Sequence, residues 1–144
     1  NHGFQIINES IDEVTDHAQM DMHWIAQEND VKDDEMSTVS QYNENNYHDF
    51  EWFEGVAVIR FYADWCAPCV QNFPIFEQFA EVFSQSHPEI KFGKVNIDQS
   101  PILTLRYNVY GLPSTLIFKN SQIIQRIAGV KSFSEYSNIL KLLI

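Results

Sequence analysis

The sequence Trp65-Cys66-Ala67-Pro68-Cys69 is the most informative stretch of this 144-residue chain. It lies between an apolar run at residues 56–63 and a helical pattern at residues 70–84, so we expect a strand-to-helix junction here. Two cysteines with two residues between them can form a disulfide or bind zinc or iron. A zinc site with this spacing normally needs a second pair of ligands, and the chain has no third cysteine. Redox chemistry is therefore the favoured interpretation, and we expect no metal and no other cofactor.

The expected helix explains why the two cysteines would be reactive. Cys66 would lie at or just before the first turn, where unpaired N–H groups and the helix dipole stabilise a thiolate. Pro68 suits a first turn because its missing N–H would have no intrahelical partner there. Cys69, one turn further on, is placed to resolve a mixed disulfide formed by Cys66. A purely structural disulfide is the weaker alternative, because so short a loop removes little entropy from the unfolded chain.

Further motifs follow in a fixed order along the chain. They are Pro74, five residues after the second cysteine, Lys94 in Gly93-Lys94-Val95-Asn96-Ile97-Asp98, the turn Gly111-Leu112-Pro113-Ser114-Thr115, and Gly129. With Trp-Cys-Ala-Pro-Cys, this set resembles the thioredoxin family over about residues 37–144. The resemblance implies a thioredoxin fold, an α/β architecture with a central mixed sheet flanked by helices.

The resemblance also implies how a protein substrate would be held. Pro113 would be in the cis form and would bring the backbone of Leu112 beside the Cys66 sulfur, where an extended chain could add as a strand. The implied substrate-binding set is Trp65, Ala67, Pro68, Leu112, Pro113 and Gly129. No membrane span or nucleic-acid partner is expected, since the chain has neither a long apolar stretch nor clustered basic residues.

Arg60 departs from the family pattern. Thioredoxins usually bury an aspartate six residues before the first cysteine, where it helps to move the proton of the resolving thiol. Arginine stays protonated, so Arg60 cannot serve as that base. Either an acidic residue neutralises it, its head reaches the surface, or its charge acts on the cysteine pair. Arg60 and Lys94 are therefore candidate redox-tuning residues.

The first 36 residues differ in composition from the remainder. They carry ten acidic residues against Lys32 alone, so we treat residues 1–36 as an acidic extension and residues 37–144 as a thioredoxin-like domain. Apolar residues at positions 7, 11, 14, 18, 22 and 25 predict a helix over about 11–27. Residues 4–7 could instead form a short strand leading into it. Docking of the extension on the domain and recruitment of a partner both remain open.

Within the domain, the hydrophobic pattern predicts alternating strands and helices. Strands are expected at residues 37–42, 56–63, 90–97, 115–118 and 122–127, and helices at 45–53, 70–84, 101–107 and from Ser132 onward.

The sequence thus predicts a thiol–disulfide oxidoreductase that reduces or exchanges protein disulfides, with Cys66 as nucleophile. Two alternatives are an extracytoplasmic disulfide oxidant or isomerase, and a non-catalytic peptide-binding module whose acidic helix docks a partner. The expected partners are protein disulfides and a reductase or membrane thiol donor. A cytoplasmic and a periplasmic or secreted location fit equally well. Because the chain begins with Asn1, we expect that an upstream segment has been removed.

Overall fold

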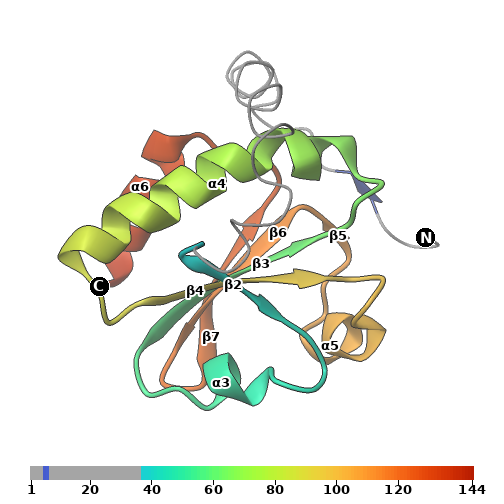
Figure 1. Ribbon diagram of the computed structural model, residues 1–144, viewed down its shortest axis with the longest axis horizontal. Coiled ribbons are helices and arrows are strands. Elements are labelled where there is room, and N and C mark those ends of the chain that lie inside the picture. The colour runs from blue at the N-terminus through green and yellow to red at the C-terminus, as the bar shows by residue number, and fades with distance from the viewer. Residues whose placement is uncertain (1–4, 7–36) are drawn as a thin grey trace.

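A five-stranded mixed sheet forms the centre of the protein, as the computed structural model of residues 5–6 and 37–144 describes it (Figure 1). The strand order is β2-β4-β3-β6-β7. The bounds are β2 Val39–Tyr42, β3 Val56–Tyr62, β4 Lys91–Asn96, β6 Ser114–Lys119 and β7 Gln122–Ala128. Strands β2, β4 and β3 run parallel, β6 is antiparallel to β3, and β7 is antiparallel to β6. The predicted mixed sheet is confirmed.

The middle strand β3 is buried on both faces, which explains its continuous apolar sequence. Its alternate residues point in opposite directions, so Val58 packs into one hydrophobic cluster and Ala57, Ile59 and Phe61 into another. Arg60 has the same parity as Val58 and is therefore directed to the face covered by the longest helix. The one charged residue of this strand is thus placed inside the molecule.

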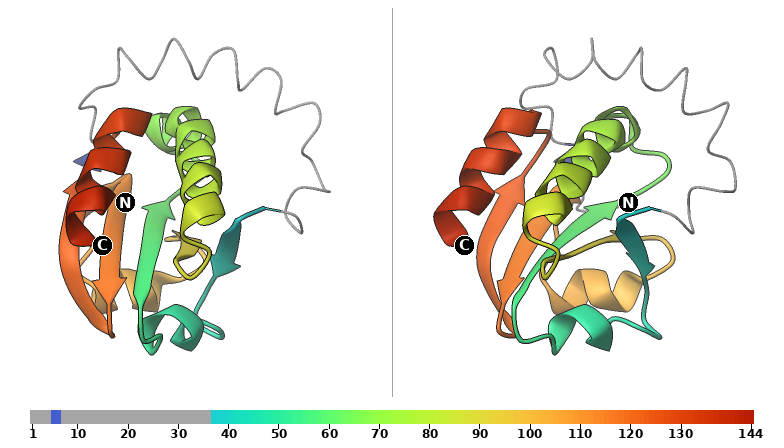
Figure 2. Two further views of the ribbon diagram at one scale, coloured as in Figure 1. Left: turned by 90° about the vertical axis from the view of Figure 1, so that its left-hand side faces the viewer. Right: turned by 60° about the vertical axis from the view of Figure 1, so that its left-hand side comes forward.

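Helices cover both faces of the sheet. Figures 1 and 2 show α4 (Ala67–Ser86) and α6 (Phe133–Leu143) on one face and α3 (His48–Glu51) and α5 (Pro101–Arg106) on the other. The first face holds a cluster rich in rings, in which Phe76, Phe79 and Tyr136 contact one another. The second holds the two cysteines together with apolar side chains of β3, β6 and α5. The described members of both clusters lie within residues 37–144.

Two helix starts follow from local capping. Cys66 is the N-cap of α4, so this helix begins at Ala67, three residues earlier than the periodic pattern alone predicts. Ser132 and Glu135 form a capping box at the start of α6, where a helix was predicted from Ser132 onward, and the Ser132 Oγ accepts from the Glu135 N–H at 3.1 Å. Both caps satisfy N–H groups that the first turn would otherwise leave unpaired.

The helix predicted at residues 45–53 is reduced to the single turn α3. Asn side chains hold the preceding segment in turns: Asn46 Oδ1 accepts from the Asn43 N–H at 2.7 Å, and Asn43 Oδ1 from the Asn45 N–H at 2.8 Å. Such side-chain bonds to the backbone compete with helix formation. The prediction was therefore too long at its N-terminal end, and it was also two residues too long at its C-terminal end.

A second, two-stranded sheet joins the start of the chain to the domain. Strand β1 (Gln5–Ile6) pairs in parallel with β5 (Gly111–Leu112), Gln5 opposite Gly111 and Ile6 opposite Leu112. The short strand that the sequence offered as an option for residues 4–7 is therefore present at Gln5–Ile6. The helix predicted over about 11–27 lies outside the described residues.

Candidate active site

The two cysteines lie at the N-terminal end of α4 and are joined by a disulfide, with their Cα atoms 5.2 Å apart. Cys66 has an extended backbone, and its sulfur accepts a hydrogen bond from the Cys69 N–H at 3.3 Å. Pro68 occupies the first turn, as predicted. After reduction, the same N–H and the positive end of the helix dipole would favour a thiolate on Cys66.

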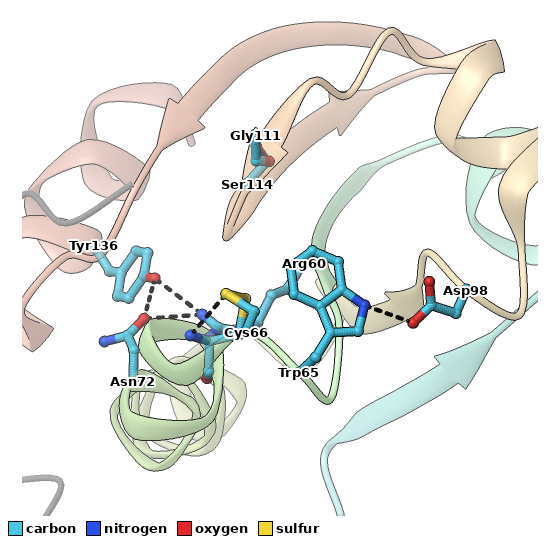
Figure 3. Close-up of a disulfide and its surroundings, with 9 residues drawn as sticks. Arg60, Trp65, Cys66, Asn72, Asp98, Gly111, Ser114 and Tyr136 are labelled. Carbon is cyan, nitrogen blue, oxygen red and sulfur yellow. Dashed lines mark hydrogen bonds between the residues drawn. A yellow bond between two sulfur atoms is a disulfide. The ribbon is translucent and has the colours of Figure 1, made fainter. Parts of the chain in front are cut away.

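Trp65 lies beside the disulfide and is fixed by a residue that the sequence analysis did not single out. Its indole Nε1 donates to Asp98 Oδ2 at 2.9 Å, and Asp98 lies on the side of Trp65 that faces away from α4 (Figure 3). The Trp65 side chain is 40% exposed. Asp98 lies two residues after the end of β4. Its position close to the carboxyl end of a strand that runs parallel to β3 was the available sequence signal. The pair presents an oriented aromatic surface at the rim of the cysteine site.

The turn before β6 contains the expected cis peptide bond between Leu112 and Pro113. Ser114 Oγ donates to the Gly111 carbonyl at 2.7 Å, which ties together the two sides of the cis bond. Gly129 adopts a positive φ of 88°, and its N–H donates to the Pro113 carbonyl at 2.9 Å. Figure 3 shows Gly111 and Ser114 in the surroundings of the disulfide.

Most of the predicted substrate-binding residues are buried. Trp65 and Ala67 are exposed, whereas Pro68, Leu112, Pro113 and Gly129 are not, and Cys66 itself has no exposed surface. Leu112 also carries one of the two residue pairs between β5 and β1. The edge strand expected to receive an extended substrate is thus already paired with an extended segment of the same chain.

Arg60 is completely buried behind the disulfide and is held by neutral groups. Its Nη1 donates to Asn72 Oδ1 at 2.9 Å and to the Tyr136 hydroxyl at 3.3 Å, and its Nη2 donates to the Cys69 carbonyl at 2.8 Å (Figure 3). The guanidinium also lies over the Phe76 ring, 5.4 Å from its centroid. Burial lowers the pKa of Arg60, and the Tyr136 oxygen partly offsets this.

Within the described residues, the Arg60 network excludes two of the alternatives left open by the sequence. The side chain does not reach the surface, and no described carboxylate contacts it. Asn72 and Tyr136 were missed, because a polar residue on α4 and a tyrosine on α6 carry no local signal of a shared partner. Their own bond, from the Tyr136 hydroxyl to Asn72 Oδ1 at 2.9 Å, closes the network.

Lys94 lies next to Arg60 in the sheet, since the two residues are register partners on β4 and β3. Its Nζ is 4.6 Å from the centroid of the Phe73 ring, and the Arg60 Cζ is 5.8 Å from the same centroid. Two cations therefore share one aromatic ring on the α4 side of the sheet. In the described part of the chain, no group of acidic, histidine or cysteine side chains is arranged to hold a metal ion.

A disulfide at the start of a helix, near a cis-proline turn, is the arrangement of a redox-active CxxC protein. The family model for thioredoxin matches residues 38–141. Thioredoxin of Chlamydia caviae is 37% identical over 78 residues, which are 54% of this chain and 72% of that protein. A thioredoxin-like protein of Synechocystis is 33% identical over 78 residues, covering 54% of this chain and 71% of that protein.

The chain therefore belongs to the thioredoxin family. The solved structure of a Malassezia sympodialis thioredoxin matches with a TM-score of 0.64 and 24% identity, over 72% of this chain and 89% of that one, and shows the same fold. At the level of the family, these matches and the cysteine pair support a thiol–disulfide oxidoreductase. No helix in the described ranges is both long enough and apolar enough to cross a membrane.

Proposed function

We propose that this protein reduces or exchanges disulfide bonds in extended protein segments through Cys66 and Cys69. The observation that carries the proposal is the capped position of Cys66, whose sulfur already accepts the Cys69 N–H at the positive end of α4. Attack on a disulfide requires a thiolate, and this environment lowers the cost of forming one at neutral pH.

The reaction proceeds in two exchanges. The Cys66 thiolate attacks one sulfur of the substrate disulfide, forming a mixed disulfide and releasing the other sulfur as a thiolate. Cys69 then loses its proton and attacks the Cys66 sulfur, which forms the Cys66–Cys69 disulfide and releases the second substrate thiolate. Two electrons pass from the dithiol to the substrate, and both released thiolates take up protons. An external dithiol donor must reduce Cys66–Cys69 before the next cycle.

Substrate recognition would use backbone pairing beside the cis-proline. The β5 edge supports this proposal, because it pairs with the extended residues Gln5 and Ile6 in the present structure. A substrate strand in the same place would lie alongside Leu112 and Pro113, with Trp65 and Ala67 providing the exposed rim. Backbone pairing depends little on sequence, so such a site would accept many unrelated chains.

The test is reduction of insulin disulfides by dithiothreitol, with the protein as catalyst. The wild type should accelerate the reaction, whereas Cys66→Ser should give only the uncatalysed rate while keeping its near-ultraviolet circular dichroism. If Cys66→Ser and wild type are equally active, the assignment of the nucleophile is wrong. If the wild type shows no turnover but both proteins still bind unfolded chains, the non-catalytic peptide-binding alternative gains support.

A further inference from the structure

Arg60 is a buried cation without a counterion among the described groups that contact it. A guanidinium removed from water normally needs a charged partner as well as hydrogen bonds. Its partners here are an amide oxygen, a hydroxyl and a backbone carbonyl, and its Nε has no hydrogen-bond partner among the residues that the structure describes. Within the described residues, the positive charge is therefore only partly compensated while the cysteines are joined as a disulfide.

The described elements that surround Arg60 add no negative charge in contact with it. From α4, the contacts to Arg60 are the Cys69 carbonyl, the Asn72 side chain and the rings of Phe73 and Phe76. Tyr136 on α6 is neutral, because burial raises the pKa of its hydroxyl. The titratable groups next to Arg60 in the sheet are Tyr62, on the same strand, and Lys94, on β4, and Lys131 acts on Tyr136 from the loop before α6.

The direction of the Arg60 bonds points to the second cysteine. Nη2 donates to the carbonyl of Cys69 itself, and Nη1 binds Asn72, which lies one turn further along α4. The Cys69 side chain is 2% exposed, so water does little to stabilise a thiolate there. A thiol in that position needs either a base to take its proton or a fixed cation to stabilise its anion.

We propose that Arg60 promotes resolution of the mixed disulfide by stabilising the Cys69 thiolate through its charge, in place of a proton-accepting group. The inference rests on the proposed exchange reaction and assigns Arg60 as a positioning residue within it. When Cys69 ionises, its proton leaves to the departing substrate thiolate, and the anion becomes the counterion that Arg60 lacks in the oxidised protein. Reduction of the disulfide is favoured for the same reason.

The thiol pKa of Cys69 can be measured alone in a Cys66→Ser background, from thiolate absorbance near 240 nm. Adding Arg60→Gln, which keeps hydrogen-bonding capacity but removes the charge, should lower the acid dissociation constant of Cys69 at least tenfold. Arg60→Lys keeps the charge and should retain most of the wild-type value. Lys91→Met removes a cation at the far end of β4 and should leave the Cys69 pKa unchanged.

The redox equilibrium with glutathione gives a second readout in the protein with both cysteines. Arg60→Gln should shift the equilibrium constant about tenfold toward the disulfide, which is about 30 mV toward more negative potential for two electrons. Arg60→Met serves if the Gln variant does not keep the near-ultraviolet circular dichroism of the folded protein. A Cys69 pKa that is unchanged in the neutral variants, or that rises equally in Arg60→Lys, would overturn the proposal. The pKa and glutathione measurements require no catalytic turnover. A failure of the proposed exchange function would therefore appear only in the insulin assay, and would be distinguished from a failure of the Arg60 proposal.

Discussion

Removal of residues 1–36 should increase the activity of the domain toward protein disulfides. The deletion takes away β1, which pairs with Gly111 and Leu112 beside the cis-proline, where Cys66 is fully buried. The five-stranded sheet lies within residues 37–144, as do the described members of both hydrophobic clusters, so the truncated chain should fold. Folding of the truncated chain would also support residue 37 as the start of the domain.

The size of the effect follows from the length of the pairing. Two paired residues make about two backbone hydrogen bonds, each worth about 0.5–1.5 kcal/mol net. While β1 occupies the β5 edge, only the fraction of molecules in which β1 has detached can bind substrate. The apparent affinity for substrate is reduced in proportion to that fraction. At about 1.4 kcal/mol for each factor of ten, opening the edge should raise kcat/KM for insulin reduction about 5- to 150-fold.

The assay compares the full chain, the truncated chain and a full-length Ile6→Pro variant at one dithiothreitol concentration. Proline cannot donate to a strand ladder, so Ile6→Pro should reproduce part of the increase without shortening the chain. The glutathione redox equilibrium should be the same in all three proteins, since the α4 N-terminus and Arg60 are unchanged. Equal or lower kcat/KM in a folded truncated protein would refute the idea that β1 competes with substrate.

Two further predictions concern stability, the first through pH. The Glu51 carboxylate accepts Nε and Nη2 of Arg106 at 2.8 and 2.6 Å and also the Tyr107 hydroxyl, so its pKa lies below the usual 4.5. A carboxyl whose pKa is lowered by folding stabilises the protein above its unfolded pKa, and that contribution is lost as the pH falls through the folded value. Urea unfolding from about pH 6 to pH 3 should therefore show a shallower loss of stability for Glu51→Gln than for wild type, and parallel curves would contradict this. Second, a methyl group at Gly93 would overlap the Tyr42 ring, so Gly93→Ala should cost about 1–3 kcal/mol in urea unfolding. The cost should shrink in a Tyr42→Leu background, and an unchanged cost would rule out this clash as the cause.

The parts of the site that the sequence predicted are those with local signals. The helix start at Cys66 follows from a short local motif, and the cis bond before Pro113 was implied by the family resemblance. Strand β3 was recognisable because burial on both faces requires a continuous apolar run. These features therefore needed no knowledge of distant contacts.

The environment of Arg60 could not be predicted, because its partners come from separate elements. Tyr136 is 76 residues away in the chain, and only the packing of α6 against α4 brings it to the guanidinium. The sequence showed that the charge was unusual, but not that it was fully buried among neutral groups. A short strand at residues 4–7 was one of the options, but its pairing with β5 was not predicted, because the two strands are far apart in the chain.

Trapping of the mixed disulfide tests the central claim of Cys66-based exchange most directly. In Cys69→Ser the first exchange can occur but the second cannot, so a protein disulfide substrate should remain attached. Mass spectrometry of the trapped species after proteolysis should find the substrate cysteine linked to Cys66. A protein that is folded and reduced but traps no substrate would contradict the account, as would a wild-type adduct linked through Cys69.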